Sequence, residues 1–273
     1  MITIATDSSV YIKKAEAETL GVRIIPLTYT ADGLPYVESY GDENGDFETL
    51  LKKSANFTTS QPSSAAFLSC FEEELAKGRQ VLCLTISSRL SGAYGTAYLA
   101  AQHTGSGNIA VFDSYLTAGG LYLLVKEAAR LIADGARLQD LSRSLPSIRD
   151  KISIAFSVDD IAPLRASGRV GFVRMGVGTI LDIKPILICK DGAVVYENSA
   201  RGSADLSKKL ACKVSDNVSD AVINYIGDNR AVMNLYTMVK AAHPDIMIKL
   251  QKVGPVLGIH IGLKAMGISV LSR

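Results

Sequence analysis

The sequence predicts an α/β protein of two domains. Residues 1–150 are expected to form an α/β domain around a parallel sheet, and residues 151–273 an α+β domain with a mixed sheet. In the first half, short β-branched runs alternate with helical patterns, which favours a parallel sheet covered by helices. In the second half, strand patterns outnumber helical ones and an Asp-Gly hairpin signal appears. The length of 273 residues is enough for two such domains.

Strands and helices alternate through the first half. Apolar residues recur with a period near 3.6 in Ala65–Lys77, which therefore reads as a helix that Gly78 ends. The run Val81–Ile86 is apolar except for Thr85, which is typical of a strand covered on both faces. The expected elements are strands at Ile2–Thr6, Val22–Leu27, Val81–Ile86 and Ile109–Phe112, and helices at Ala65–Lys77, Gly92–Gln102 and Ala118–Asp134.

The second half is expected to be richer in strands. Asp191-Gly192 separates two β-branched runs and predicts a hairpin turn. The spacing of apolar residues in Asp228–Ala242 indicates an amphipathic helix, and Leu164–Gly171 reads as a loop. The expected strands are Ile152–Val158, Ile183–Cys189, Ala193–Glu197, Ala221–Ile226, Ile246–Val253, Val256–His260 and Gly267–Leu271.

Composition and charge exclude several classes of protein. Lysine and arginine number 29 and aspartate and glutamate 27, and a net charge of +2 does not suggest a nucleic-acid surface. No apolar stretch approaches the roughly 20 residues that cross a bilayer, and the first residues lack the pattern of a secretory signal. The cysteines form no C-x-x-C pair and the histidines are dispersed, so we expect buried, reduced thiols and no metal site. A cytoplasmic protein without nucleic-acid partners is expected.

Four clusters of hydroxyl side chains stand at predicted strand ends or helix starts, where open α/β sheets bind ligands. They are Asp7-Ser8-Ser9, Thr58–Ser63, Ser87–Gly92 and Asp113-Ser114. Helix N-termini carry unpaired N–H groups and partial positive charge, so hydroxyls beside them can form a neutral site for a carboxylate or phosphate. The same residues are also ordinary helix caps, and both interpretations stay open.

Standard nucleotide and hydrolase motifs are missing. There is no G-x-x-x-x-G-K-[ST] loop and no complete dinucleotide loop, and Arg89 breaks the G-x-S-x-G pattern around Ser91. His260 follows an apolar run between glycines and is either structural or functional. Arg165, Arg169 and Arg174 are either solvated loop charges or anion contacts. The residues alone therefore indicate an anion-tolerant cleft with no named ligand.

Taken in order, these clusters resemble the motifs of the DegV family of bacterial fatty-acid-binding proteins, the acyl-carrying subunit of fatty acid kinase. The ordered pair Thr-Ser-Gln-Pro-Ser and Ser-Ser-Arg-Leu-Ser-Gly is the most specific part. The matching pieces are Thr6–Ser9; Thr59–Ser63; Ile86–Tyr94; Phe112–Ser114; Ser167–Gly171; Ile183–Ile186 with Asp191-Gly192; Arg201; and Gly254–Val256 leading to His260.

The resemblance implies a two-domain DegV-like fold with one long-chain fatty acid, such as palmitate or oleate, in an interior tunnel. Thr59 and Ser91 would hold the carboxyl group, and His260 beside it would assist phosphate transfer. Arg169 and Arg201 would serve the work with a separate kinase subunit, which phosphorylates the acid to an acyl phosphate with ATP. The chain itself would then be no enzyme and need no cofactor or metal. It would act in phospholipid metabolism, with transient contact to a membrane surface.

Two alternative functions stay open from the sequence. One is a serine-dependent hydrolase or acyltransferase, with Ser91 as nucleophile and His260 as base. The other is a small-molecule phosphocarrier in which His260 itself is phosphorylated.

Overall fold

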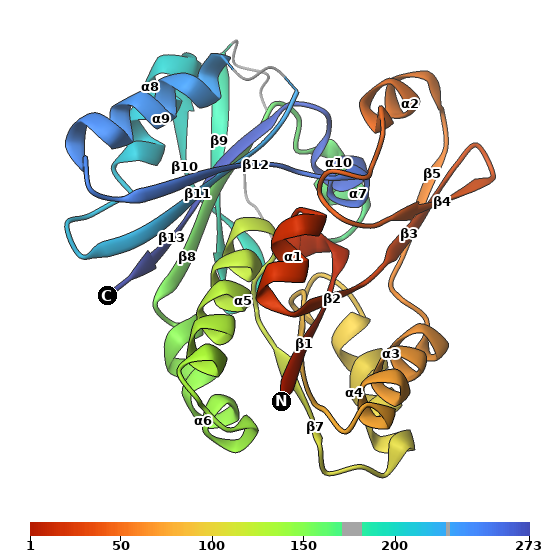
Figure 1. The fold of residues 1–273 in the computed structure, drawn as a ribbon. Coiled ribbons are helices and arrows are strands. Elements are labelled where there is room, and N and C mark those ends of the chain that lie inside the picture. Colours follow the sequence, from red (N-terminus) through yellow and green to blue (C-terminus); the bar gives the residue numbers. More distant parts are fainter. Residues whose placement is uncertain (171–181, 228–229) are drawn as a thin grey trace.

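The computed structural model describes residues 1–170, 182–227 and 230–273, which form two large sheets and one small one (Figure 1). The first sheet has the order β2-β1-β6-β7 and is parallel throughout. This confirms the parallel sheet expected in the first half. Its strands are β1 (Ile2–Asp7), β2 (Val22–Ile25), β6 (Gln80–Thr85) and β7 (Ile109–Asp113).

Helices cover both faces of this sheet, which explains the unbroken apolar run in β6. Val81 and Cys83 pack with α3 and α4, whereas Leu82 and Leu84 pack with α5 and α6. Alternate side chains of a strand point to opposite faces, so a strand buried on both sides favours apolar residues at successive positions. The helices of this region are α1 (Lys14–Leu20), α3 (Ser64–Ala76), α4 (Ala93–Thr104), α5 (Ala118–Ala133) and α6 (Leu138–Arg149), with a 3-10 turn η1 (Ser8–Val10) after β1.

A small antiparallel sheet projects from the first sheet and was not predicted. The expected strand Val22–Leu27 ends at Ile25, and a new strand begins at Leu27, after Pro26. Proline has no N–H for a strand ladder, so it separates the two strands. The small sheet has the order β4-β3-β5. It consists of β3 (Leu27–Ala31), β4 (Leu34–Glu38) and β5 (Phe57–Ser60), with α2 (Phe47–Lys53) between β4 and β5 in the chain.

The third sheet is mixed, as expected for the second half. Its order is β10-β9-β8-β13-β11-β12, in which β11 and β12 pair in parallel and the other pairs are antiparallel. Helices α8 (Gly202–Ala211), which was not predicted, and α9 (Arg230–Ala242) cover one face. The strands are β8 (Ile152–Val158), β9 (Ile183–Lys190), β10 (Ala193–Arg201), β11 (Val218–Ile226), β12 (Met247–Lys252) and β13 (Ala265–Ser272).

Helix α5 lies between the first and third sheets (Figure 1). Its start fits closely against the third sheet, since a Cβ added at Gly120 would lie 2.5 Å from Cδ1 of Ile154. One hydrophobic cluster therefore joins Leu82 of the first sheet to Val222 of the third through α5. The predicted division of the chain at residue 150 stays a prediction, because α5 belongs to the first half by sequence and packs against both sheets.

The predicted strand Val256–His260 is wrong, because this segment forms the helix α10 (Pro255–Ile261). A short, mostly apolar run is compatible with a strand or with one buried helical turn, and its tertiary contacts determine which of the two forms. Here Pro255 occupies the first turn, which suits proline, and the carboxylate of Glu38 accepts a hydrogen bond from the Val256 N–H at 2.8 Å. Part of the expected loop at Leu164–Gly171 is also helical, in α7 (Ala162–Ala166).

The cysteine prediction is only partly correct. All four thiols are free, but Cys70 and Cys83 alone are fully buried, and Cys212 is exposed at the end of α8. In the described ranges, no helix is long and apolar enough to cross a membrane.

Candidate functional site

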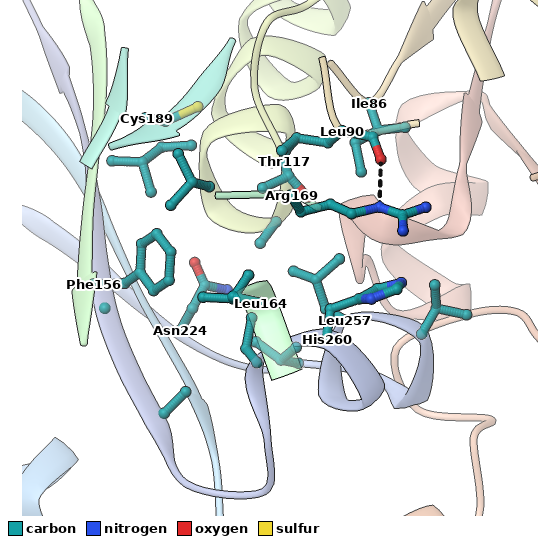
Figure 2. Close-up of a pocket in the computed structure, with 18 of the residues that line it drawn as sticks. Ile86, Leu90, Thr117, Phe156, Leu164, Arg169, Cys189, Asn224, Leu257 and His260 are labelled. Atoms are coloured by element: carbon teal, nitrogen blue, oxygen red, sulfur yellow. Dashed lines mark hydrogen bonds between the residues drawn. The ribbon is translucent and has the colours of Figure 1, made fainter. Parts of the chain in front are cut away.

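A cavity of about 370 Å³ lies where the three sheets and α10 meet. This volume falls within the range of about 300–1,000 Å³ that is usual for small-molecule sites. Most of its wall is apolar, and polar side chains interrupt it at several places (Figure 2). The apolar lining includes Leu27, Ile86, Leu90, Ile154, Phe156, Leu164, Val194, Val253, Val256, Leu257, Ile261 and Ile268.

Thr59 and His260 meet in the wall of this cavity, although 201 positions separate them in the chain. Their side chains are joined by a hydrogen bond of 2.9 Å between Thr59 Oγ1 and His260 Nε2. Thr59 does not stand at a helix start, as the sequence suggested; it lies in β5, paired with Tyr29. The cap of α3 is Ser63, which accepts a hydrogen bond from the Ala66 N–H.

Ser91 lies in the loop that leads into α4, and it also lines the cavity. Its Oγ accepts a 3.3 Å hydrogen bond from the Ala93 N–H, so its hydroxyl proton can still be donated. Gln61, two residues after Thr59 in the same motif, holds this loop close to β5. Its amide donates to Thr96 at 2.7 Å and lies so close to Gly92 that a Cβ there would be 2.2 Å from Gln61 Oε1.

Arg169 reaches the cavity from the segment after α7. Its Nε donates to the carbonyl oxygen of Leu90 at 3.4 Å (Figure 2), and its Nη1 donates to the Ser167 carbonyl at 2.5 Å. The guanidinium therefore lies beside the Leu90-Ser91 loop. Thr59, Ser91, His260 and Arg169 thus share one cavity, although they come from four separate segments of the sequence.

His260 is held in its neutral form. Burial of the ring, with a further contribution from the positive charge of Arg169, lowers the pKa of His260 from 6.5 to about 4. A protonated His260 could balance phosphate charge, but the protein without ligand does not favour that state. An anion brought next to the ring would raise this pKa again.

Glu38 is a buried carboxylate that sequence reasoning missed. It ends β4 and accepts hydrogen bonds from the Val256 N–H at 2.8 Å and the Ser8 hydroxyl at 2.9 Å. Burial raises its pKa to about 7. Because Val256 is in the first turn of α10, Glu38 fixes the helix that carries His260. No sequence signal pointed to Glu38, since the contact depends on β4 reaching α10 in space.

Two of the four hydroxyl clusters bind neighbouring loops through their aspartates. Asp7 accepts hydrogen bonds from the Ile86 N–H at 2.6 Å and from Ser9, and Asp113 accepts from the Ser88 N–H at 3.0 Å. Burial raises the pKa of Asp7. These side chains join the loops that end β1, β6 and β7, and Asp7 also caps the turn η1, as the capping interpretation expects. They are not among the residues that line the described cavity.

The remaining motif residues take different places. The Asp191-Gly192 hairpin turn is confirmed, with φ of 48° and 79°, and the Gly192 carbonyl accepts a 2.7 Å hydrogen bond from Ser87. Arg201 is exposed at the start of α8, away from the described cavity lining. Arg165 is exposed on α7, while Arg174 lies outside the described residues.

Comparisons with known proteins agree with this architecture. The whole chain, residues 1–273, matches the family model described as "Uncharacterised protein, DegV family". A DegV domain-containing protein of Halalkalibacterium halodurans is 29% identical over 275 residues, which cover 98% of this chain and 97% of that protein.

Solved structures share the fold over its full length. A fatty-acid-binding DegV family protein from Thermus thermophilus has 30% identity and a TM-score of 0.90, covering 100% of this chain and 99% of that one. The Streptococcus pneumoniae Fatty Acid Kinase (Fak) B3 protein, loaded with linoleic acid, has 18% identity and a TM-score of 0.85, with 100% of both chains covered. The second similarity concerns the fold alone.

Proposed function

Because the chain belongs to the DegV family, we propose that it binds one long-chain fatty acid, such as palmitate or oleate, in the cavity. The carboxylate lies between Thr59, Ser91 and His260, and the hydrocarbon chain lies along the apolar wall. The observation that carries this proposal is that Thr59, Ser91, His260 and Arg169 line one cavity whose wall is mostly apolar, with Thr59 and His260 in direct contact. The fatty acids bound by related proteins support the same ligand class.

Burial of the hydrocarbon chain supplies most of the binding free energy. About 15 methylenes at about 0.8 kcal/mol each would contribute roughly 12 kcal/mol before the costs of ordering are subtracted. Contacts to the carboxylate therefore only have to orient it. Hydroxyl donors provide it without a tight salt bridge, which leaves a carboxylate oxygen able to react.

The proton between Thr59 and His260 decides how the carboxylate is held. We assign the hydrogen to His260 Nε2, which donates it to Thr59 Oγ1. Thr59 can then donate its own hydroxyl proton to the fatty acid. A carboxylate at this place raises the pKa of the His260 ring. Binding of the acid should therefore take up protons at pH values between the lower pKa of the free protein and the raised pKa of the complex. Palmitate affinity should therefore increase as the pH falls from about 7 toward 5.

We further propose that the bound acid is presented to a separate kinase in the cytoplasm, with transient contact to a membrane surface when the acid is loaded. A carboxylate oxygen attacks the γ-phosphorus of ATP, the bond to the β-phosphate oxygen breaks, and ADP leaves. The acyl phosphate that forms is a precursor class for phospholipid metabolism. Arg169 beside the head group, and Arg201 on the surface, would balance the added negative charge.

The test begins with protein that has never been given ligand. Native mass spectrometry should show a bound long-chain fatty acid, and delipidated protein should bind palmitate or oleate. Thr59→Val combined with Ser91→Ala should weaken binding about tenfold or more, because two hydroxyl donors are lost. Thr58→Val is the matched control, since Thr58 is an exposed neighbour in β5 that contacts Thr30. Failure of delipidated wild-type protein to bind either acid would remove the proposal.

The kinase step has its own measurement. Acyl phosphate is trapped with hydroxylamine after incubation of the loaded protein with ATP and a fatty acid kinase subunit. Arg201→Gln should slow its formation, and Lys208→Gln, an exposed change on the same helix α8, serves as the control. Equal rates for both variants would exclude Arg201 from the kinase contact.

The hydrolase and phosphocarrier alternatives have direct tests. The His260 ring contacts the hydroxyl of Thr59, whereas a hydrolase of the kind considered would pair it with Ser91. Labelling of Ser91 by a fluorophosphonate probe would support hydrolysis. An acid-labile phosphate on His260 would support the phosphocarrier.

A further inference from the structure

A second group of polar side chains lines the same cavity. It consists of Thr117, Asn224 and Ser269. Figure 2 shows Asn224 beside Phe156, with His260 on the opposite side of Leu164. The oxygens Thr117 Oγ1 and Ser269 Oγ are buried and have no hydrogen-bond partner among the described residues. These hydroxyls therefore stand unpaired in a wall that would otherwise suit a hydrocarbon chain.

The orientation of Asn224 is fixed by a chain of hydrogen bonds. Gln251 uses its Nε2 to donate to the carbonyls of Val10 and Tyr11, at 3.0 and 3.1 Å, so its Oε1 is the acceptor that faces Asn224. Asn224 Nδ2 donates to that oxygen at 2.8 Å. Its Oδ1 accepts the Gly119 N–H at 2.9 Å, in the first turn of α5. One lone pair of Oδ1 and one hydrogen of Nδ2 remain for another partner.

Asn224 and Ser269 converge on the start of α5. They lie on neighbouring strands, where Val222 pairs with Ser269 and Asn224 with Gly267, so their side chains share one face. A Cβ added at Gly119 would lie 2.3 Å from Asn224 Oδ1 and 2.9 Å from Ser269 Oγ. Gly267 has no side chain beside Asn224, because a Cβ there would lie 2.6 Å from Cβ of Phe156. The three polar groups thus come from the N-cap of α5, from β11 and from β13.

Such a group is unfavourable for a ligand made only of methylenes. Water can pair with these hydroxyls before a ligand enters, but a saturated chain displaces that water and offers no hydrogen bond in return. Alanine or valine at the same positions would avoid this penalty. A ligand hydroxyl, by contrast, can donate one hydrogen bond and accept two.

We propose that Thr117, Asn224 and Ser269 form a second polar subsite, which binds a hydroxyl group carried by the hydrocarbon part of a long-chain fatty acid. This inference rests on the proposed fatty-acid binding and adds the substrate class: hydroxy fatty acids, recognised at the head by Thr59 and Ser91 and along the chain by this subsite. The geometry that carries it is the unpaired Ser269 hydroxyl beside an amide of fixed orientation, with the unpaired Thr117 hydroxyl at the N-cap of α5 in the same cavity.

The experiment compares stearic acid with derivatives that carry a single hydroxyl at successive carbons, using delipidated full-length protein and isothermal calorimetry. One derivative should bind about tenfold tighter than stearic acid, because one or two neutral hydrogen bonds are gained. Oleic acid is included to separate a hydroxyl preference from a preference for a bent chain.

Variants then assign the preference to the subsite. Ser269→Ala should reduce the preference for the hydroxy acid and tighten binding of stearic acid about threefold, because an unpaired hydroxyl is removed. Ser157→Ala is the matched control: Ser157 is also buried with an unpartnered Oγ, on the neighbouring strand β8, but does not belong to the cavity lining. It should leave the ratio of the two affinities as in the wild type.

The outcomes separate this inference from the proposed function. If stearic acid itself fails to bind, the proposed function fails. If stearic acid binds and no hydroxy derivative binds tighter, the subsite proposal alone is overturned. It is also overturned if oleic acid gains as much as the best hydroxy acid, or if Ser269→Ala keeps the wild-type ratio. If hydroxy acids bind no tighter than stearic acid and an ordered water joins Ser269 to Asn224 in the stearate complex, the three side chains bind water and not a ligand hydroxyl.

Discussion

Two buried glutamates lie near opposite ends of strand β1, and their surroundings differ. Near the start of β1, Glu74 accepts hydrogen bonds from Thr3, Arg23, Lys77 and Arg79, at 2.7–3.0 Å. Although burial opposes its charge, the hydrogen bonds from Lys77, Thr3 and Arg79 lower the pKa of Glu74 to about 2. This end of the sheet keeps a charge that is fully compensated.

Beyond the other end of β1, Glu38 receives its two described hydrogen bonds from neutral donors, the Ser8 hydroxyl and the Val256 N–H. Burial raises its pKa to about 7. The carboxyl ends of parallel strands are where open α/β sheets bind ligands. The comparison teaches that the buried charge at one end of β1 is compensated, which serves stability. At the end near the cavity, the titratable carboxyl of Glu38 contacts the first turn of the helix that carries His260.

Removing the compensated carboxylate should have the largest effect on stability. Glu74→Ala leaves Thr3 without its partner and three cations facing one another, and we expect a loss of about 3 to 4 kcal/mol in the free energy of unfolding. Urea denaturation measures it, with the exposed neighbour Glu72→Ala as control. A loss below that of the control would contradict the structural role of this cluster.

Glu38 should make stability depend on pH in the opposite sense to an ordinary ion-paired carboxylate. Its pKa is raised from 4.5 to about 7, so the folded protein binds more protons between these values. Stability from Glu38 is present at low pH and lost as the pH rises through about 7, by about 2 to 3 kcal/mol.

The Glu38→Gln variant isolates this contribution. His260, with its lowered pKa, acts in the opposite direction between about pH 4 and 6.5, so only the difference between wild type and Glu38→Gln is informative. The variant should lose stability less steeply than the wild type from about pH 5 to 8. Parallel stability curves for the two proteins would show that Glu38 does not titrate in this range.

The imidazole of His260 should stay neutral in the protein without ligand. Its signals in heteronuclear NMR should not titrate near 6.5, because burial and Arg169 hold the pKa at about 4. Arg169→Gln removes the positive charge and should raise this pKa, while Arg165→Gln on the exposed side of α7 should not. A midpoint near 6.5 in the wild type would exclude the buried, neutral ring.

The smallest effect is expected from one of the three cations around Glu74. Lys77 is about half exposed and is one of several donors, so Lys77→Ala should cost about 0.5 to 1 kcal/mol or less. Chemical denaturation at low and high salt measures it. A loss as large as that from Glu74→Ala would show that the cations act as a unit.

Much of the fold was predictable because it depends on local pattern. The continuous apolar run of β6 indicates a strand buried on both faces, and Asp191-Gly192 fits the positive φ angles of its turn. The error at Val256–His260 has the same physical basis, since a short apolar run fits a strand or a helix. Glu38 and Pro255 select the helix, and only one of them is close in sequence.

The candidate site shows the same limit. Hydroxyl clusters and a lone histidine could be picked out from the sequence, and their family roles came from the resemblance in motif order. The 2.9 Å contact between Thr59 and His260 follows only from the packing of α10 against β5. Glu38 and Asn224 gave no signal, because each acts through a partner that is far away in the chain.

By itself the sequence determined the alternation of strands and helices, the two kinds of large sheet and the set of hydroxyl segments, since these are set by spacing along the chain. Tertiary structure alone decided which of those hydroxyls face a common cavity, how His260 is oriented and which carboxylates are compensated. Those properties depend on distances and burial between segments that come together only when the three sheets and α10 pack.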